Sequence, residues 1–273
     1  MGDHPCVGVI EEAEAALVAQ WSLLGRAPGC KLHERDGVRW FETPIPSLPY
    51  NGVVRTWLAD GPEADAVIAR VLGRFRSRGV QHLWFVAPSS TPAELGPRLA
   101  AQGLQEIERM TYMSFELVSW NAPPLRGEAT FSEVLDDDDL RIYNSLTVDY
   151  WELSEAEEEL VYELQRSLGP GRVPGHRYLA RIDGTPVGKA YLSLAGTPGV
   201  ASFYGMSVQP AARGRGIARD LTLTLLGRAQ REGCHRVVIH SSTAGLDLYR
   251  RMGFAEHCVL PVHASTQLWA GAH

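Results

Sequence analysis

One stretch in the second half of the sequence constrains the fold more than any other. Val200 to Val208 (VASFYGMSV) is rich in β-branched and aromatic residues and predicts a strand. The glycine- and arginine-bearing segment 209–218 follows, and Ile217, Leu221 and Leu225 recur four residues apart. That spacing places the three side chains on one face of a helix. A strand that leads through such a turn into a helix predicts an α/β (α+β) domain.

The turn has the features of an anion-binding site. Backbone N–H groups in the first turn of a helix have no intrahelical partner, and the helix dipole adds partial positive charge there. Gly214 and Gly216 lack a Cβ atom, so the backbone can approach a phosphate closely. Arg213 and Arg215 add positive charge and hydrogen-bond donors. The alternative is a solvated turn before a surface helix.

Two common phosphate-binding motifs do not fit this turn. A P-loop requires a Lys-Ser/Thr pair after its last glycine, where this chain has Ile217 and Ala218. A dinucleotide-binding fingerprint requires GxGxxG, and the sixth position counted from Gly214 is Arg219.

The segment Val208-x-Pro-x-x-Arg-Gly-x-Gly-x-Ala instead resembles the acyl-CoA-binding motif of the Gcn5-related N-acetyltransferase (GNAT) superfamily. The resemblance implies that the loop from Arg213 to Ala218 cradles the pyrophosphate of coenzyme A. It also implies that the end of the preceding strand lies beside the pantetheine arm and holds the thioester through backbone hydrogen bonds. The cofactor-binding residues implied are Met206, Ser207, Val208, Arg213, Gly214, Arg215, Gly216, Ile217, Ala218 and Ser242.

A second segment, residues 241–254, resembles the later GNAT motif, which contains a tyrosine and ends in Gly-Phe. The resemblance implies that Tyr249 is the general acid that protonates the departing thiolate of CoA. A donor near the sulfur lowers the cost of that developing charge. Without the first motif, Tyr249 would be interpreted as a packed aromatic residue. Many family members have Asn where Ser242 stands, and Ser242 can hydrogen-bond to the cofactor or cap the helix.

The motifs do not determine the general base. His240 lies on the predicted strand before Ser241 and titrates in a suitable range, but a histidine in a central strand is as often a core residue. Tyr204 lies on the strand before the turn, and Glu152 with Asp149 offers acids beside aromatic residues. These are candidate bases or acceptor contacts. An amine held close to the thioester needs no side-chain base.

The chain divides at residues 121–127 (NAPPLRG), which break regular structure. We expect two GNAT-like domains, each a twisted mixed sheet flanked by helices: a degenerate one over residues 1–120 and a catalytic one over 128–273. The helix–strand–helix pattern around the strand Arg236 to Ser241 recurs around His82 to Ala87, each time with glycine after the helices. Unrelated units with the same element order are the alternative.

The N-terminal half lacks the chemistry of the C-terminal half. No Arg-Gly-x-Gly segment precedes its helix at about 62–78, and Asp60, Glu63 and Asp65 at that helix start would repel a pyrophosphate. Leu99 stands where the repeated pattern has Tyr249. We therefore expect this half to be structural or to help form the acceptor pocket.

The rest of the C-terminal half fits the same fold. Among the four aspartates after Leu135, Asp137 or Asp138 suits a helix N-cap, so the run predicts a helix start and no metal site. The expected elements are a strand over 129–135, two helices across about 138–168, and a hairpin of 178–182 with 186–195.

Composition excludes several classes of protein. The net charge of −6 gives no general attraction to nucleic acid or to an anionic membrane. The sequence has no apolar run of about 20 residues and no signal-peptide pattern at its acidic N-terminus. The four cysteines are too widely spaced for a zinc cluster or disulfide framework, so we expect a cytoplasmic protein.

The sequence thus predicts an N-acyltransferase that uses acetyl-CoA or another acyl-CoA, with acetyl as the expected group. The acceptor is expected to be a small-molecule amine that attacks the thioester directly in a ternary complex. Two alternatives remain: a donor on the phosphopantetheine arm of an acyl carrier protein, and a non-catalytic acyl-CoA sensor, which would not need Tyr249. The acceptor, the acyl group and the oligomeric state are not determined by the sequence.

Overall fold

The computed structural model describes residues 5–151, 153–169 and 174–265. The elements before the linker are α1 (Pro5–Leu24), β1 (Lys31–Arg35), β2 (Val38–Glu42), β3 (Gly52–Thr56), α2 (Pro62–Ser77), β4 (Leu83–Phe85), α3 (Leu95–Ala101) and β5 (Leu104–Glu116). Those after it are β6 (Thr130–Glu133), α4 (Asp137–Trp151), α5 (Glu155–Ser167), β7 (Gly175–Ile182), β8 (Thr185–Ser193), β9 (Val200–Val208), α6 (Ile217–Arg231), β10 (Arg236–Ser241), α7 (Leu246–Arg251) and β11 (Ala255–Ser265). Short 3₁₀ turns lie at Pro210–Ala212 and Thr243–Gly245.

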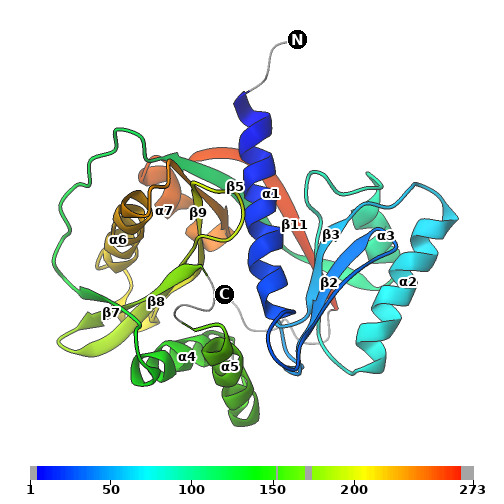
Figure 1. Cartoon of the computed structure of the whole chain (residues 1–273), viewed down its shortest axis with the longest axis horizontal. Coiled ribbons are helices and arrows are strands. Elements are labelled where there is room, and N and C mark those ends of the chain that lie inside the picture. The colour runs from blue at the N-terminus through cyan, green and yellow to red at the C-terminus, as the bar shows by residue number, and fades with distance from the viewer. Residues whose placement is uncertain (1–4, 152, 170–173, 266–273) are drawn as a thin grey trace.

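The strands of both halves form a single mixed sheet with helices on both faces (Figure 1). The strand order is β1-β2-β3-β4-β11-β5-β10-β9-β8-β7-β6. The predicted α/β class is confirmed, and the strands of the two halves are hydrogen-bonded into one continuous sheet. No helix in the described ranges is long and apolar enough to cross a membrane.

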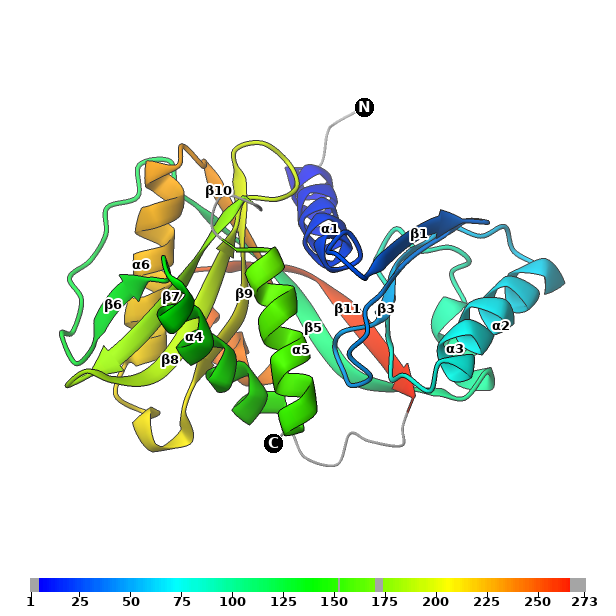
Figure 2. The same ribbon diagram turned by 60° about the horizontal axis from the view of Figure 1, so that its bottom comes forward.

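The last strand of each half lies inside the sheet of the other half. β11 pairs antiparallel with β4 and β5, and β5 pairs antiparallel with β10. The two strands therefore cross between the halves at the centre of the sheet (Figure 2). On each side a parallel pair follows outward, β4 with β3 and β10 with β9. The helix–strand–helix pattern that the sequence repeats therefore occurs once on each side of the central strands β11 and β5.

The helices form two layers. Val238 of β10 belongs to the same buried cluster as Leu17 of α1 and Val161 of α5. The neighbouring Val237 instead packs with Leu225 of α6, because successive strand residues point to opposite faces. Helix α1 runs across the junction between the two halves on the first of these faces (Figure 1).

The predicted boundaries agree closely with the structure around the motifs. Strands β9 and β10 begin and end at the expected residues, and the glycines after α2 and α6, Gly79 and Gly233, have positive φ. The predicted N-cap of α4 is wrong by one residue. The cap is Asp136, because its carboxylate accepts a hydrogen bond from the backbone N–H of Asp139 at 2.8 Å, and α4 begins at Asp137.

Candidate active site

Strands β9 and β10 separate part-way along their length. Their parallel pairing ends at Phe203 and Ile239, and beyond that point β9 continues to Val208 without β10 as a neighbour. The register of β9 against β8 shifts at Gly205, where φ is 57°. Such a bulge redirects the backbone groups that follow it. The last residues of β9 therefore border the opening between the two strands.

The turn after β9 presents unpaired backbone amides. Gly216 caps α6 in a left-handed conformation with φ 82°, and Gly214 has φ 78°. The first intrahelical bond runs from the N–H of Asp220 to the carbonyl of Gly216 at 3.0 Å. Within the described ranges, the N–H groups from Gly214 to Ala218 donate to no backbone carbonyl. Five amide donors around the start of the 15-residue helix α6 are therefore available to an anionic ligand.

The predicted arginines of the turn have different surroundings. Arg213 donates from Nε to the carbonyl of Val208 at 3.1 Å, which ties the turn to the end of β9. Arg215 pairs with Glu128 at 2.8 Å, so part of its charge is already compensated. Ile217 is buried beneath the turn, where it anchors the helix start in the core.

Tyr249 lies on α7 and points toward the end of β9. Its hydroxyl is 3.5 Å from the sulfur of Met206, and its ring packs against Phe254 with the ring centroids 5.2 Å apart. Burial raises the pKa of Tyr249, so the phenol stays protonated at neutral pH. The residue is thus packed, as the alternative interpretation required, and its hydroxyl contacts Met206 near the end of β9. Ser242 precedes a 3₁₀ turn, and its side chain makes no capping bond there.

His240 and Tyr204 form a second group. The imidazole of His240 donates from Nε2 to the carbonyl of Ala13 in α1 at 3.0 Å, and it stacks on Tyr204 with the ring centroids 5.9 Å apart. Burial lowers the pKa of His240 to about 4. The ring is therefore neutral at pH 7, with an unprotonated Nδ1. That Nδ1 and the hydroxyl of Tyr204 are both buried without a hydrogen-bond partner in the described structure.

The two groups lie on opposite faces of the sheet. Met206 and Tyr249 pack in the cluster under α6 and α7, whereas His240 contacts α1 on the other face. Sequence analysis treated Tyr249, His240 and Tyr204 as members of one site. In the structure Tyr249 lies beside Met206 on one face of the sheet, and His240 stacks on Tyr204 on the other face. The remaining candidate, Glu152, lies outside the described residues, as does the side chain of Asp149.

Sequence reasoning missed Lys189 of β8. This lysine pairs across the sheet with Ser207, one of the residues implied to lie beside the pantetheine arm. Its ammonium group is buried, donates to the hydroxyl of Thr147 and lies 4.6 Å from the ring centre of Tyr143. Burial lowers its pKa to about 7. The signal was a single lysine inside an otherwise apolar predicted strand, VGKAYL.

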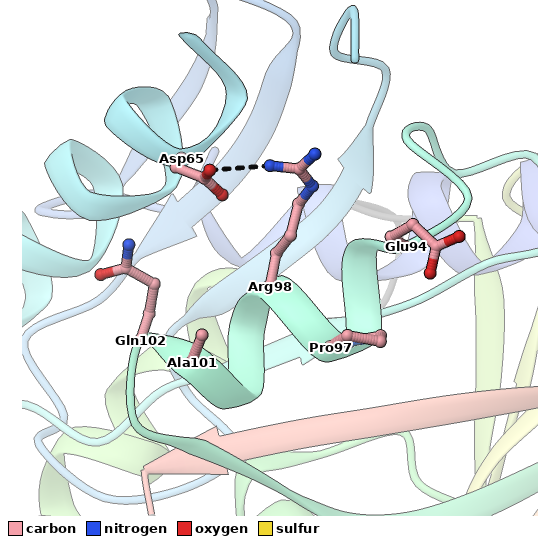
Figure 3. A pocket seen from close by; sticks show the side chains of 6 residues that line it. All are labelled: Asp65, Glu94, Pro97, Arg98, Ala101 and Gln102. Atoms are coloured by element: carbon pink, nitrogen blue, oxygen red, sulfur yellow. Dashed lines mark hydrogen bonds and ion pairs between the residues drawn. The ribbon is translucent and has the colours of Figure 1, made fainter. Parts of the chain in front are cut away.

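The corresponding region of the N-terminal half holds an internal ion pair. Near the start of α2, Asp60 pairs with Arg98 of α3 at 2.6 Å. Asp65 pairs with the same arginine at 2.7 Å (Figure 3). The side chain of Leu99, next along α3, is fully buried. A pocket in this region is lined by Asp65, Glu94, Pro97, Arg98, Ala101 and Gln102. Two of the three acids at this helix start are therefore ion-paired with one arginine of the same chain. The described residues contain no group of three or more His, Cys, Asp or Glu side chains that could hold a metal ion.

Comparison with known families supports the class that this site suggests. Residues 140–254 match the model of the acetyltransferase (GNAT) family. The match includes β9, the glycine turn, α6, β10 and Tyr249. This segment is therefore similar to a GNAT acetyltransferase domain.

Solved structures share the fold of the whole chain. A GCN5-related N-acetyltransferase from Kribbella flavida has a TM-score of 0.66 and 16% identity, with 93% of this chain and 95% of that chain covered. A tandem GNAT protein from the clavulanic acid biosynthesis pathway has a TM-score of 0.62 and 17% identity, with 96% and 95% covered. These two likenesses establish the fold over both halves. A mycothiol acetyltransferase from Arthrobacter sp. (strain FB24) is 34% identical over 77 residues, which are 27% of this chain and 24% of that protein.

Proposed function

We propose that this protein transfers an acyl group, acetyl in the first instance, from acyl-CoA to an amine of a small molecule. The observation that carries the proposal is the position of Tyr249. Its protonated hydroxyl lies beside Met206 near the end of β9, the strand that leads into the amide-rich turn before α6. A protein that only binds acyl-CoA has no need of a proton donor there.

The chain's own groups suit each part of the donor. The N–H groups of the turn and the charge of Arg213 would hold the pyrophosphate, and a Cβ atom at Gly216 would collide with the side chain of Arg126 beside the turn. The end of β9, from Met206 to Val208, would lie along the pantetheine arm with its backbone groups free of β10. The thioester would then sit near the hydroxyl of Tyr249, where the thiolate develops and a proton is required.

His240 and Tyr204 are poor general bases in this arrangement. A histidine with a pKa of about 4 removes a proton from an ammonium group only weakly. Burial raises the pKa of Tyr204, so its hydroxyl stays protonated as well. We infer that the amine enters deprotonated or passes its proton to water. In that case His240 and Tyr204 would contribute hydrogen bonds and shape on the α1 face.

The acceptor is proposed only as a class. The partial relative is named for mycothiol, a small molecule, and the aligned stretch spans about a quarter of its length. This likeness supports a small-molecule acceptor over a protein acceptor.

Calorimetric titration with acetyl-CoA and CoA tests the donor, using wild type and Gly216→Glu. The expected result is micromolar binding that Gly216→Glu abolishes, because a carboxylate would occupy the anion site. A thiol-release assay against a library of amines then tests transfer, and Tyr249→Phe should slow turnover without weakening CoA binding. Binding without release for any amine would favour a sensor. If wild type does not bind either ligand, free acyl-CoA is not the donor, and acetylated acyl carrier protein becomes the next donor to assay.

A further inference from the structure

The linker between the halves runs along α6 and is fixed across its N-terminus (Figure 1). At one end of this path the side chain of Gln230 donates to the carbonyl of Trp120 at 3.0 Å. At the other end the backbone N–H of Arg126 donates to the carboxylate of Asp220 at 2.6 Å. Asp220 is 2% exposed and lies in the first turn of α6. A buried carboxylate thus holds the linker against the phosphate turn.

Contacts on both sides of Arg126 strengthen this attachment. Before it, the carbonyl of Pro124 accepts a hydrogen bond from Arg219, which also pairs with Asp220 at 2.6 Å. After it, Glu128 pairs with Arg215 of the turn at 2.8 Å. The backbone of Arg126 is therefore anchored from three positions, and less conformational entropy is lost when its side chain binds a ligand.

The side chain of Arg126 lies directly over Gly216. A Cβ atom at Gly216 would be 2.7 Å from Cδ and 2.9 Å from an Nη atom of Arg126. The guanidinium group thus lies against Gly216, the N-cap of α6. Arg126 itself is an exposed residue. Among the described residues it pairs with no carboxylate, whereas the neighbouring Arg215 and Arg219 are both ion-paired.

We propose that Arg126 binds the pyrophosphate of the acyl-CoA donor, so that the linker forms one wall of the donor site. This inference rests on the function proposed above. The pyrophosphate would lie between the amides of the turn and the guanidinium of Arg126. An arginine suits that role because its planar group can donate two parallel hydrogen bonds to phosphate oxygens. The linker then has a binding role in addition to joining the halves.

Calorimetric titration of wild type, Arg126→Ala and Arg231→Ala with CoA and with 3′-dephospho-CoA tests this proposal. Arg231 is exposed in the last turn of α6, so its removal changes the charge equally at the far end of the helix. We expect Arg126→Ala to raise the Kd about 10- to 100-fold for both ligands, the loss typical of a charged hydrogen bond. Arg231→Ala should leave both Kd values within about twofold of wild type.

The possible outcomes distinguish the assignment of Arg126 from the proposed acyltransferase function. If wild type binds CoA and Arg126→Ala binds it equally well, the assignment of Arg126 is wrong and the proposed function stands. Tighter binding by Arg126→Ala would show that the side chain covers the site, which also overturns the assignment. A loss seen with CoA and absent with 3′-dephospho-CoA would place Arg126 on the 3′-phosphate instead. If wild type binds neither ligand, the proposed function itself fails.

Discussion

The hydroxyl oxygen of Tyr249 lies 3.5 Å from the sulfur of Met206, on the α7 side of the opening between β9 and β10. Met206, near the end of β9, packs against the buried cluster that lies under α6 and α7. The contact therefore fixes the proposed proton donor relative to the strand implied to hold the thioester.

Replacing Tyr249 by Phe should reduce kcat about 100-fold or more while KM for the acyl donor changes little. The substitution removes only the hydroxyl, so the packing against Phe254 is kept. Steady-state thiol release with a saturating amine measures the effect. A variant that retains full kcat would show that the thiolate leaves without this proton, and a matched fall in thermal stability would indicate a structural role instead.

Gly216→Ala should weaken CoA binding, whereas Gly227→Ala should leave binding unchanged and stabilise the fold, although both glycines belong to the same helix region. At Gly216 the backbone has φ 82° and an added Cβ would collide with Arg126, so we expect a Kd for CoA raised at least tenfold. At Gly227, inside α6, an added Cβ has no atom within 4 Å. Alanine there should stabilise the protein by about 1 kcal/mol. Titration with CoA and thermal unfolding distinguish the two effects. Equal binding by both variants would argue against a phosphate beside Gly216.

Lys189→Met should stabilise the protein and remove part of its pH dependence. Burial lowers the folded-state pKa of Lys189 to about 7 from 10.5, so between these values the unfolded chain binds more protons. Stability in wild type therefore rises with pH from about 7 to about 10.5, and below pH 7 the full cost of the buried charge is present. At pH 7 we expect Lys189→Met to raise Tm by about 2–8 °C, the shift for about 1–2 kcal/mol in a chain of this size.

The control for this experiment is Lys31→Met, which changes the only other lysine of the sequence at an exposed position. It should leave both Tm and the pH dependence unchanged. A rise of stability with pH that persists in Lys189→Met would assign that dependence to other groups.

A fragment of residues 121–273 should not fold by itself, although it includes the whole segment that matches the GNAT family. Without β5, the strands β10 and β11 lose the partner that lies between them, and two long edges are exposed. Circular dichroism and size-exclusion chromatography of the fragment, alone and co-expressed with residues 1–120, measure this. A soluble, cooperatively unfolding fragment would contradict the prediction, and recovery only on co-expression would support it.

The local structure around the motifs was predictable from sequence because it depends on short-range patterns. Apolar spacing and the two glycines define β9, the turn and α6 without reference to the rest of the chain. The tyrosine follows at a fixed distance from β10 along the sequence, so its approach to Met206 agrees with the family resemblance.

The long-range features were not predictable from these patterns. The pairing of β5 with β10 and β11 joins residues more than a hundred positions apart, and alternation within a strand says nothing about its neighbours. Arg126 stood in a segment recognised only for its prolines and glycine, and its position over Gly216 depends on the buried Asp220. Likewise, the burial of Lys189 depends on α4, which covers that face of β8.

The central place of β11 also sets the order of events during synthesis. The strand spans Ala255–Ser265, and both β4 and β5 need it as a hydrogen-bonding partner. When residues 1–120 leave the ribosome, their sheet still has a gap at its centre. That gap is filled only after β6 to β10 have been made. The half that is translated first is therefore completed last.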